Sequence, residues 1–417
     1  MIVGSLRRLF RRFLEVRKKH GMRNALGMTI SYMRTRAPFI IRLLFQTGAR
    51  RSIRHNVHIL MQEDSKAPLI SIVARGGLGD HLQTARYIRD LVQQSEGFTF
   101  DIYTKRPKVA AWAFGSIQGF HAAYDEWLLN ETFYDATLDV LHFVSVRRSS
   151  LRVRRLRKYP RLLQLLENVL RATATDLCAQ HSPELDNLLA QKAVFSNCTS
   201  ANYLHYLTGI DYGGDNLAIA CNFTKLLEYD LNPQSYITVH NGFDKMFVPV
   251  DHPTKVYPRF QDVVQNLRRK YPEIVFVQLG SLEAGKPIDA VDLNLVGKTT
   301  LSESAGIIQN ALLHIDSEGG LVHVAACVGT PSAVVFGPTP LSFFGYPRNL
   351  NIHLSTCGGC WWVNDTWMSK CPRGFHDPVC MSDQDPLSVA DAIATYLDSH
   401  LVGQDRVEFI GLKQQTV

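Results

Sequence analysis

Short apolar runs alternate with longer amphipathic segments along most of this 417-residue chain. The runs are four to six residues long, a length typical of strands that are buried in a parallel sheet. Between them, His81–Gln93 keeps its apolar residues on one helical face, and Leu321–Val328 is typical of a short helix of small residues. The pattern predicts an α/β chain, with strands at Leu69–Val73, Phe98–Tyr103, Val140–Val144, Lys192–Phe195, Tyr236–His240, Ile274–Leu279, Leu293–Val296, Leu312–Asp316 and Ala333–Phe336.

A glycine turn follows the apolar run that ends at Ile315. Open α/β sheets bind ligands outside the carboxyl ends of their strands, and a glycine-rich helix start leaves backbone N–H groups available to a phosphate. Gly319, Gly320 and His323 are therefore candidates for an anion site, and Asp316 can bind a sugar hydroxyl. A plain turn without chemistry is the alternative for this segment taken alone.

A second glycine turn, from Ala74 to Asp80, follows the strand predicted at Leu69–Val73. It is no dinucleotide fingerprint, because the third glycine would fall at Leu82. Two such turns, one in each half of the chain, suggest two Rossmann-like halves that face one cleft. Asp80 would point into that cleft, or would only complement the dipole of its own helix.

The eight cysteines fall into two groups. Four are scattered among apolar neighbours and are interpreted as small core residues: Cys178, Cys198, Cys221 and Cys327. The others lie within 24 residues, and four thiolates so close together suit a structural zinc or iron. A disulfide pair, or His376 in place of one ligand, is the alternative, and four protein ligands leave no open position for catalysis. These candidate ligands are Cys357, Cys360, Cys371 and Cys380.

Positive charge is concentrated at the amino terminus, within an overall net charge of +7. Up to Arg54, fourteen Lys or Arg stand against one acid, Glu15. The segment from Leu6 to Leu14 keeps an apolar face at helical spacing, and such a helix lies in an anionic membrane interface, where each basic residue adds about 1 kcal/mol. A mitochondrial transit peptide and a helix packed on the protein are the alternatives. No run here reaches the ~20 apolar residues needed to span a membrane.

A second basic cluster holds eight Lys or Arg between Arg147 and Arg161. A solvated helix is the default interpretation, and binding of acceptor phosphates or lipid head groups is the functional one. A nucleic-acid partner is not expected, because the basic clusters lack interleaved aromatic residues and no nucleic-acid module is recognisable.

Six segments in order, over roughly residues 68–395, together resemble the ADP-heptose transferases of glycosyltransferase family 9, the lipopolysaccharide heptosyltransferases and their relatives. The last segment is similar to the cysteine segment of the heptosyltransferase II branch. The six are Gly79-Asp80 with Leu82 and Thr84, His240-Asn-Gly242 with Lys255-Val-Tyr-Pro258, Gln278-Leu-Gly280 with Glu283, Leu295–Leu301, Asp316–Pro338, and Cys357-x-x-Cys360 with Cys371 to Met381.

The resemblance implies a GT-B-type α/β fold, in which two Rossmann-like domains face a central cleft. We expect a basic helical extension over 1–66, an acceptor domain over 67–230, a nucleotide-sugar domain with the cysteine loop 357–380 over 231–395, and a tail over 396–417. The helix predicted at Pro386–His400 would cross back onto the first domain. Two departures from the family pattern stand out. Arg86 occupies a position that is usually Pro, and two extra residues separate Asp316 from His323, so that either Asp316 or Glu318 can fill the acidic role.

The resemblance also implies roles for individual residues. Asp80 would be the general base, and Lys255 would stabilise the departing diphosphate without a catalytic divalent ion. Glu283 would hold the donor ribose, and Asp316 a hydroxyl of the sugar. The predicted donor-binding set is Gly79, His240, Gly242, Glu283, Asp316, Glu318, Gly319, Gly320 and His323.

The function implied is an inverting transfer of heptose, or a related sugar, from ADP-heptose to a hydroxyl of a lipopolysaccharide core or related surface glycan. Such an enzyme would be cytoplasmic, at the inner face of the bacterial inner membrane. Two alternatives remain. The first is a protein O-heptosyltransferase of the autotransporter type, which also carries a cysteine metal loop. The second is a non-catalytic, metal-stabilised protein whose basic arms bind membrane or nucleic acid.

Overall fold

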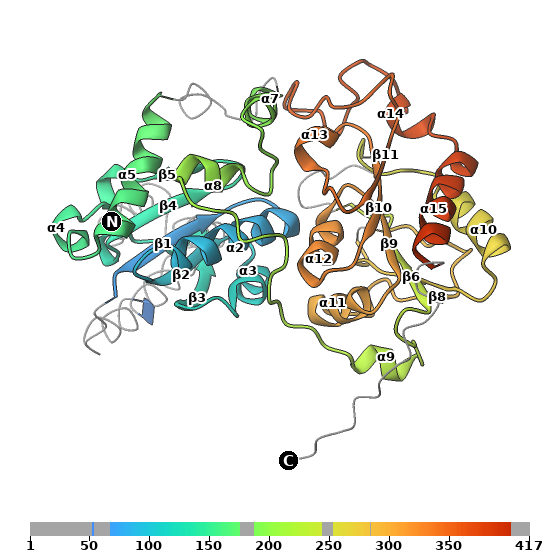
Figure 1. Ribbon diagram of the computed structural model, residues 1–417, viewed down its shortest axis with the longest axis horizontal. Helices are drawn as coiled ribbons and strands as arrows, with labels where there is room; N and C mark the ends of the chain where they lie inside the picture. The colour runs from blue at the N-terminus through green and yellow to red at the C-terminus, as the bar shows by residue number, and fades with distance from the viewer. Residues whose placement is uncertain (1–51, 54–66, 176–186, 244–252, 284, 402–417) are drawn as a thin grey trace, which may run out of the picture. The chain divides into compact units, whose positions relative to one another are not determined.

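A computed structural model describes residues 52–53, 67–175, 187–243, 253–283 and 285–401 (Figure 1). Within these residues, every strand belongs to one compact unit formed by Ala67–Glu126 and Tyr134–Val417. The amphipathic helix predicted in the first 66 residues lies outside the described residues, apart from residues 52–53. The domain boundaries given above remain a prediction.

The first sheet has the strand order β3-β2-β1-β4-β5. All its pairs are parallel except β4 with β5. All six residues of β1 are buried, as expected for a central strand with both faces covered. The strand order reverses beside β1, so that β1 and β4 flank the point where such sheets bind ligands. The strands are β1 (Leu69–Ala74), β2 (Thr99–Thr104), β3 (Phe120–Asp125), β4 (Ala136–Val140) and β5 (Val144–Val146).

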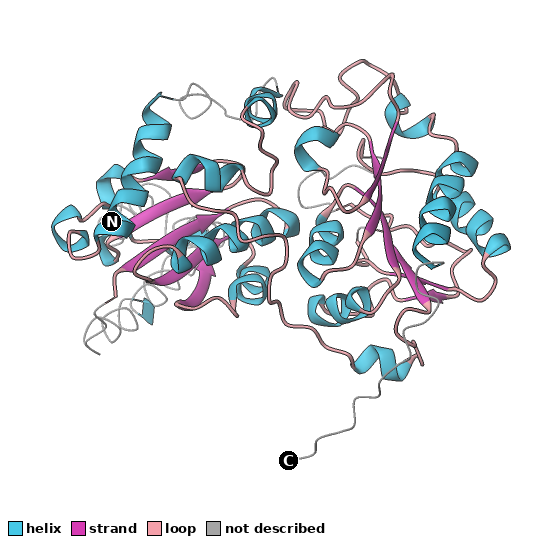
Figure 2. Cartoon of the chain, viewed as in Figure 1, coloured by secondary structure: helices cyan, strands magenta, loops and turns pink. Residues whose placement is uncertain are grey.

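The second sheet is entirely parallel, in the order β11-β10-β9-β6-β7-β8 (Figure 2). Its order reverses between β6 and β9, which gives this half a switch point of the same kind. The two sheets confirm the predicted α/β class with two Rossmann-like halves. The strands are β6 (Tyr236–Val239), β7 (Val275–Gln278), β8 (Leu293–Asn294), β9 (Leu313–Ser317), β10 (Ser332–Phe336) and β11 (Leu350–His353).

Helices connect and cover the strands. The longer ones are α2 (Leu78–Gln93), α3 (Pro107–Phe114), α5 (Pro160–Thr175), α7 (Leu188–Phe195), α10 (Phe260–Lys270), α11 (Leu301–Gln309), α12 (Gly320–Val328) and α15 (Pro386–Leu401). The shorter ones are α4 (Val153–Leu156), α8 (Tyr203–Thr208), α9 (Thr224–Glu228), α13 (Leu341–Phe344) and α14 (Val379–Ser382), with 3-10 turns at Glu126–Leu128, Glu131–Phe133 and Arg148–Ser150.

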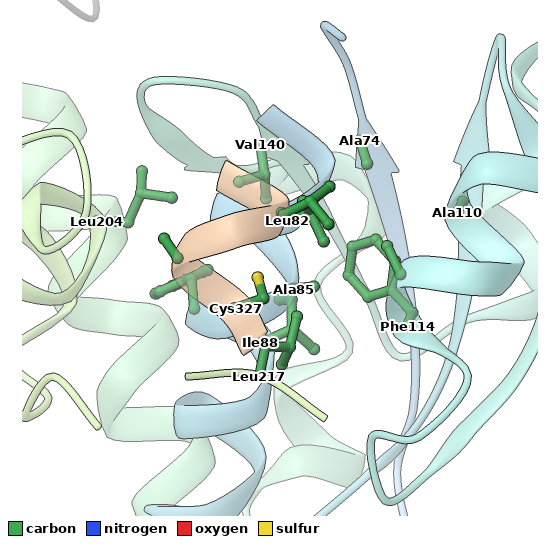
Figure 3. Close-up of a cluster of buried hydrophobic side chains, with 14 of the residues drawn as sticks. Ala74, Leu82, Ala85, Ile88, Ala110, Phe114, Val140, Leu204, Leu217 and Cys327 are labelled. Carbon is green, nitrogen blue, oxygen red and sulfur yellow. The ribbon is translucent and has the colours of Figure 1, made fainter. Parts of the chain in front are cut away.

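The two halves meet where α2 packs against α12. Leu82, Ala85 and Ile88 follow one another at helical spacing on α2, and all three are buried. Figure 3 shows α12 lying against them, with Cys327 near Ala85 and Ile88. One hydrophobic cluster includes side chains of both helices and of both sheets. The amino termini of the two helices that follow the glycine turns are thereby held close together.

Two predicted strands are wrong. The segment predicted at Val140–Val144 is a turn between β4 and β5, closed by a hydrogen bond from the Leu141 N–H to the Phe143 carbonyl. The run predicted at Lys192–Phe195 is the end of helix α7, and its Phe195 is 92% exposed, so the run is not a buried strand. The edge strands β3 and β11 were not predicted, because their residues are only partly buried and lack a continuous apolar run.

The last described helix, α15, was predicted but packs elsewhere than expected. Its apolar face lies against α10 and β11 in the second half, and Val389, Ile393 and Leu397 are buried there. The expected crossing back onto the first half is therefore wrong for the residues up to Leu401. Among the described helices, none is long and apolar enough to cross a membrane.

Candidate active site

A cavity of about 520 Å³ opens where the two switch points meet. Its walls come from the loops that follow β1, β4, β6, β7 and β9, all at the carboxyl ends of parallel strands. The amino termini of α2 and α12 also line it. Partial positive charge from both helix ends, together with their N–H groups, therefore faces the same space, which favours an anion.

Asp80 stands on one wall of this cavity, in the first turn of α2. Its Oδ2 accepts a hydrogen bond of 2.6 Å from the Gly77 N–H, and its Oδ1 lies 3.1 Å from Nε2 of His142. Burial raises the pKa of the carboxyl. The hydrogen bond and charge of His142, followed by the Gly77 N–H, outweigh this effect, and the pKa falls from 3.8 to about 2. The carboxylate thus caps its own helix and remains ionised, with its side chain 25% exposed.

Gly76 gives Asp80 its room. Its φ of +91° lies in the left-handed region, and a Cβ at this residue would stand 2.2 Å from Oδ2 of Asp80. Any side chain here would therefore strain the backbone and displace the carboxylate. The glycine turn is what allows the strand to end and the carboxylate to fold back over the helix start.

His142 was not among the residues that the sequence pointed to. It lies in the turn after β4, next to β1 in the sheet, and its side chain is only 12% exposed. Edge-on contacts with Trp361 and Phe344, with ring centroids 5.0 and 6.0 Å away, hold the imidazole against Asp80. The pair forms a carboxylate–imidazole couple that can take up and pass on a proton.

Lys255 and Glu318 form an ion pair on the wall that the second half contributes to the cavity, with Nζ and Oε2 2.5 Å apart. The side chains are 17% and 8% exposed. Burial raises the pKa of Glu318, but Lys255 and His323 outweigh this effect and lower the pKa to about 2. The Tyr257 N–H donates to the Ser317 hydroxyl at 3.0 Å, which ties the lysine segment to the loop after β9.

His240 directly follows β6 and also lines the cavity. Its Nδ1 lies 2.9 Å from Oδ1 of Asp316, which in turn lies 3.4 Å from Nε2 of His314. Burial lowers the pKa of His240, but the charge and hydrogen bond of Asp316 outweigh it and raise the pKa overall. Asp316 is 1% exposed and does not line the cavity, so it orients His240 from behind.

The structure brings most of the predicted site residues together. Those that line the cavity are Gly79, Asp80, His240, Gly242, Lys255, Glu318, Gly319, Gly320 and His323. Of the two acids that could fill the acidic role, Glu318 faces the cavity and Asp316 does not. Glu283 is also outside the lining and is exposed, so its contact with a ribose stays a prediction.

Other lining residues were missed by the sequence interpretation. Arg106, just before α3, adds a cation on the wall that the first half contributes. Trp361, Trp362 and Trp367 form an aromatic wall within the segment between the first and second pairs of predicted metal-ligand cysteines. The one signal in the sequence was that Trp361 directly follows Cys360, which belongs to the predicted cysteine loop.

Gly79 is packed directly on His323. A Cβ at Gly79 would stand 2.3 Å from Cδ2 of His323, whose ring is nearly buried. We expect Gly79→Ala to lower the free energy of unfolding by about 1–3 kcal/mol, although alanine favours a helix, because the ring must move from its place. Urea unfolding measures the loss. Gly319→Ala is the comparison, since its Cβ would have 3.6 Å of clearance, and an equal loss there would contradict the steric argument.

The four predicted cysteine ligands line a second, smaller cavity of about 150 Å³. Burial, followed by the neighbouring cysteines, raises the pKa of Cys360 to about 11 and that of Cys380 to about 12. The thiols thus lie near one another, yet within the described residues no cluster of three or more side chains has the arrangement of a metal site. The structure therefore leaves the metal as a prediction.

Comparison with known proteins now bears on this site. Residues 250–361, which include Lys255, Glu318 and Trp361, match the model of glycosyltransferase family 9, described as heptosyltransferase. This segment is therefore similar to glycosyltransferase family 9. The predicted family resemblance is thereby confirmed.

Individual known proteins are similar to this chain as well. A stretch of 47 residues is 40% identical to lipooligosaccharide heptosyltransferase 2 of Haemophilus influenzae, covering 11% of this chain and 14% of that protein. The iron-containing heptosyltransferase TibC, solved in complex with ADP-D-beta-D-heptose, aligns with a TM-score of 0.53 at 13% identity, over 80% of this chain and 77% of that one.

A second structure of TibC, from enterotoxigenic E. coli, aligns with a TM-score of 0.51 at 14% identity, over 82% of this chain and 81% of that one. At such identities the likeness concerns the fold, and it confirms the predicted GT-B-type arrangement.

Proposed function

We propose that this chain is a nucleotide-sugar-dependent glycosyltransferase that transfers heptose, or a related sugar, from ADP-heptose to a hydroxyl group. The proposal rests on one observation: an ionised carboxylate and a set of positive groups lie on different walls of one cavity. An ionised carboxylate with an imidazole partner, Asp80 with His142, stands on the wall of the first half. Lys255, the helix amino terminus at Gly320 and His323 face the same cavity from the second half.

The acceptor hydroxyl is activated from the first half. A sugar hydroxyl is a poor nucleophile until its proton is removed, and on the wall of the first half the ionised carboxylate of Asp80 can accept it. Because the pKa of Asp80 is about 2, the carboxylate alone is a weak base. His142, 3.1 Å away and neutral before the transfer, can take the proton over from the carboxylate, because an imidazole is ordinarily the stronger base.

The leaving group is stabilised from the second half. As the bond to the anomeric carbon breaks, negative charge develops on the diphosphate. Lys255 and the N–H groups at Gly319 and Gly320 are fixed donors for that charge, so a catalytic divalent ion is not required by this arrangement. With the base and the leaving-group site on opposite walls, the acceptor attacks from the side opposite the diphosphate, and the anomeric configuration inverts.

A lipopolysaccharide core or related glycan is the proposed acceptor. Trp361 and Trp362 offer the cavity apolar faces on which a sugar ring can stack, beside the base. Arg148, Arg154, Arg157 and Lys158 are exposed near α4, which supports a contact with anionic lipid surfaces at the cytoplasmic face of the membrane.

The proposed function is tested by measuring ADP release from ADP-heptose, with and without a deep-rough lipopolysaccharide acceptor. Acceptor-dependent release supports it, and mass spectrometry of the product identifies the transferred sugar. Release that requires a protein acceptor instead would favour the protein O-heptosyltransferase. If no nucleotide sugar is turned over or raises the thermal midpoint, the chain is a binding protein of another kind, since a bound donor must stabilise the fold.

We also propose that the four-cysteine cavity holds a structural zinc or iron, bound by Cys357, Cys360, Cys371 and Cys380. Metal analysis of the purified chain is expected to find about one ion per chain, and a chelator to lower the thermal midpoint, because metal binding stabilises the fold. Cys371→Ser should lose the ion. Cys198→Ser, which changes a buried cysteine outside the cavity, should retain it. Metal-free protein with an unchanged midpoint would rule the metal out.

A further inference from the structure

Arg86 is a guanidinium buried at the contact between α2 and α12. Its Nη1 donates to the Tyr346 hydroxyl at 2.7 Å, and its Nη2 donates to the Cys327 sulfur at 3.1 Å and to the His323 carbonyl at 3.3 Å. Through the part of the chain that the structure describes, no carboxylate lies within ion-pair distance of it. A buried charge without a counter-ion is costly in free energy. The presence of Arg86 at this position therefore suggests that it has a role.

The hydrogen-bond directions around Tyr346 follow from chemistry. A guanidinium can only donate, so the Tyr346 oxygen accepts from Arg86. The hydroxyl proton must then go to another acceptor, and the other partner of this oxygen is Nδ1 of His323, 2.6 Å away. Tyr346 therefore donates to Nδ1. A neutral His323 must then carry its own proton on Nε2.

Nε2 is the ring nitrogen of His323 that faces the cavity. It lies 3.7 Å from Oε1 of Glu318, and His323 is one of the lining residues. We propose that Arg86 and Tyr346 are positioning residues that fix the Nε2–H tautomer of His323, so that the ring offers a donor, not a lone pair, to an anion in the cavity. That this anion is the diphosphate of a nucleotide sugar rests on the function proposed above.

The surroundings of the ring support this direction. The charged groups that face it are Glu318, Asp80 and, through Glu318, Lys255. Two of these three are carboxylates, which accept hydrogen bonds and favour an N–H pointing towards the cavity. The hydrogen bonds that run from Arg86 through Tyr346 to His323 are called the relay below. Because Arg86 stands where the family usually has proline, the resemblance does not imply this relay.

The tautomer can be measured directly. In the full chain labelled with [15N]histidine, at pH 8, long-range 1H–15N correlation distinguishes a protonated ring nitrogen from an unprotonated one, and His323→Gln identifies the signals of His323. Wild type is expected to show Nε2 protonated and Nδ1 unprotonated. Tyr346→Phe and Arg86→Met should each convert this pattern into a mixture of both tautomers.

Tyr87→Phe is the matched control. Tyr87 neighbours Arg86 on α2, is equally buried, and bonds the Thr208 hydroxyl at 2.7 Å without touching His323. It should leave the tautomer unchanged. A proton on Nδ1 in wild type, or an unchanged tautomer in both relay variants, would overturn the proposal.

Titration with ADP separates the relay from the proposed function. Tyr346→Phe should weaken ADP binding about twofold, because the binding-competent tautomer is then only about half populated, and Tyr87→Phe should not. If wild type shows the expected tautomer but binds no ADP, the relay stands and the nucleotide-sugar function fails. If ADP binds and the tautomer is wrong, the relay fails and the function stands.

Discussion

Asp80→Asn is expected to lower kcat for sugar transfer by about 10²- to 10⁴-fold, the range for loss of a general base. The amide keeps the size of the side chain but cannot take the proton of the acceptor hydroxyl. The affinity for ADP should change by less than about twofold, because in the proposed function Asp80 acts on the acceptor and not on the diphosphate. Acceptor-dependent ADP release measures kcat, and calorimetric titration measures the affinity.

Asp90→Asn is the matched control for this result. Asp90 lies on the same helix, also has a histidine partner, His205, at 2.9 Å, and has a pKa of about 2, because the hydrogen bonds of His205 and Arg89 outweigh burial. It does not line the cavity. Its loss should therefore destabilise the fold without a comparable change in kcat. If the two variants lost equal activity per folded molecule, Asp80 would not be the base.

Lys255→Met is expected to lower the free energy of unfolding by about 3 kcal/mol at pH 7 and kcat by about 10²-fold. The first effect arises because a carboxylate that is 8% exposed, Glu318, loses its counter-ion. The second arises because the diphosphate loses its fixed cation. Urea unfolding and ADP release measure the two effects separately.

The pH dependence of the free energy of unfolding should identify Glu318 as the cause of the lost stability. Its pKa is 4.5 in an ordinary setting and about 2 in the fold, where Lys255 and His323 outweigh burial. This depressed pKa stabilises the wild type fully above pH 4.5, and the contribution is lost as pH falls through 2. The gap between wild type and Lys255→Met should therefore shrink to about half at pH 3.

Lys270→Met is the control for the ion pair itself. Lys270 pairs with Asp398 at 2.7 Å, but both side chains are 49% exposed. The free energy of unfolding should fall by less than about 1 kcal/mol, because water already solvates both charges. A loss as large as that of Lys255→Met would mean that burial of Glu318 is not what makes the first pair important.

The central strands could be predicted from the sequence because burial on both faces leaves a continuous apolar run. Leu69–Ala74 and Ser332–Phe336 are such runs. The edge strand Phe120–Asp125 mixes aromatic, small and polar residues, and helix α7 has a run of apolar residues of which Phe195 is exposed. In both cases the residues packed around the segment determine whether it forms a strand or a helix. Those residues are distant in sequence, so the local pattern does not reveal them.

The site was predictable where a glycine turn marks the chemistry, as at Asp80 and Gly319. His142 was missed because the apolar residues on either side of it suggested one strand, which hid the turn that carries it. Asp316 was assigned to the sugar because its position in the chain follows a strand end. Its side chain instead turns away, towards His240. Which face of a loop meets the ligand depends on partners that are remote in sequence.

The packing of α2 on α12 has a consequence for how the molecule unfolds. Because one hydrophobic cluster includes Ile72 and Leu82 from the first half and Val324 and Phe336 from the second, the core is continuous across the contact between the two halves. The two Rossmann-like halves should therefore melt in a single cooperative transition. The shared cluster also restricts hinge motion, since wide opening would expose Leu82 and Cys327 to water. Entry to the cavity should therefore not require the two halves to separate.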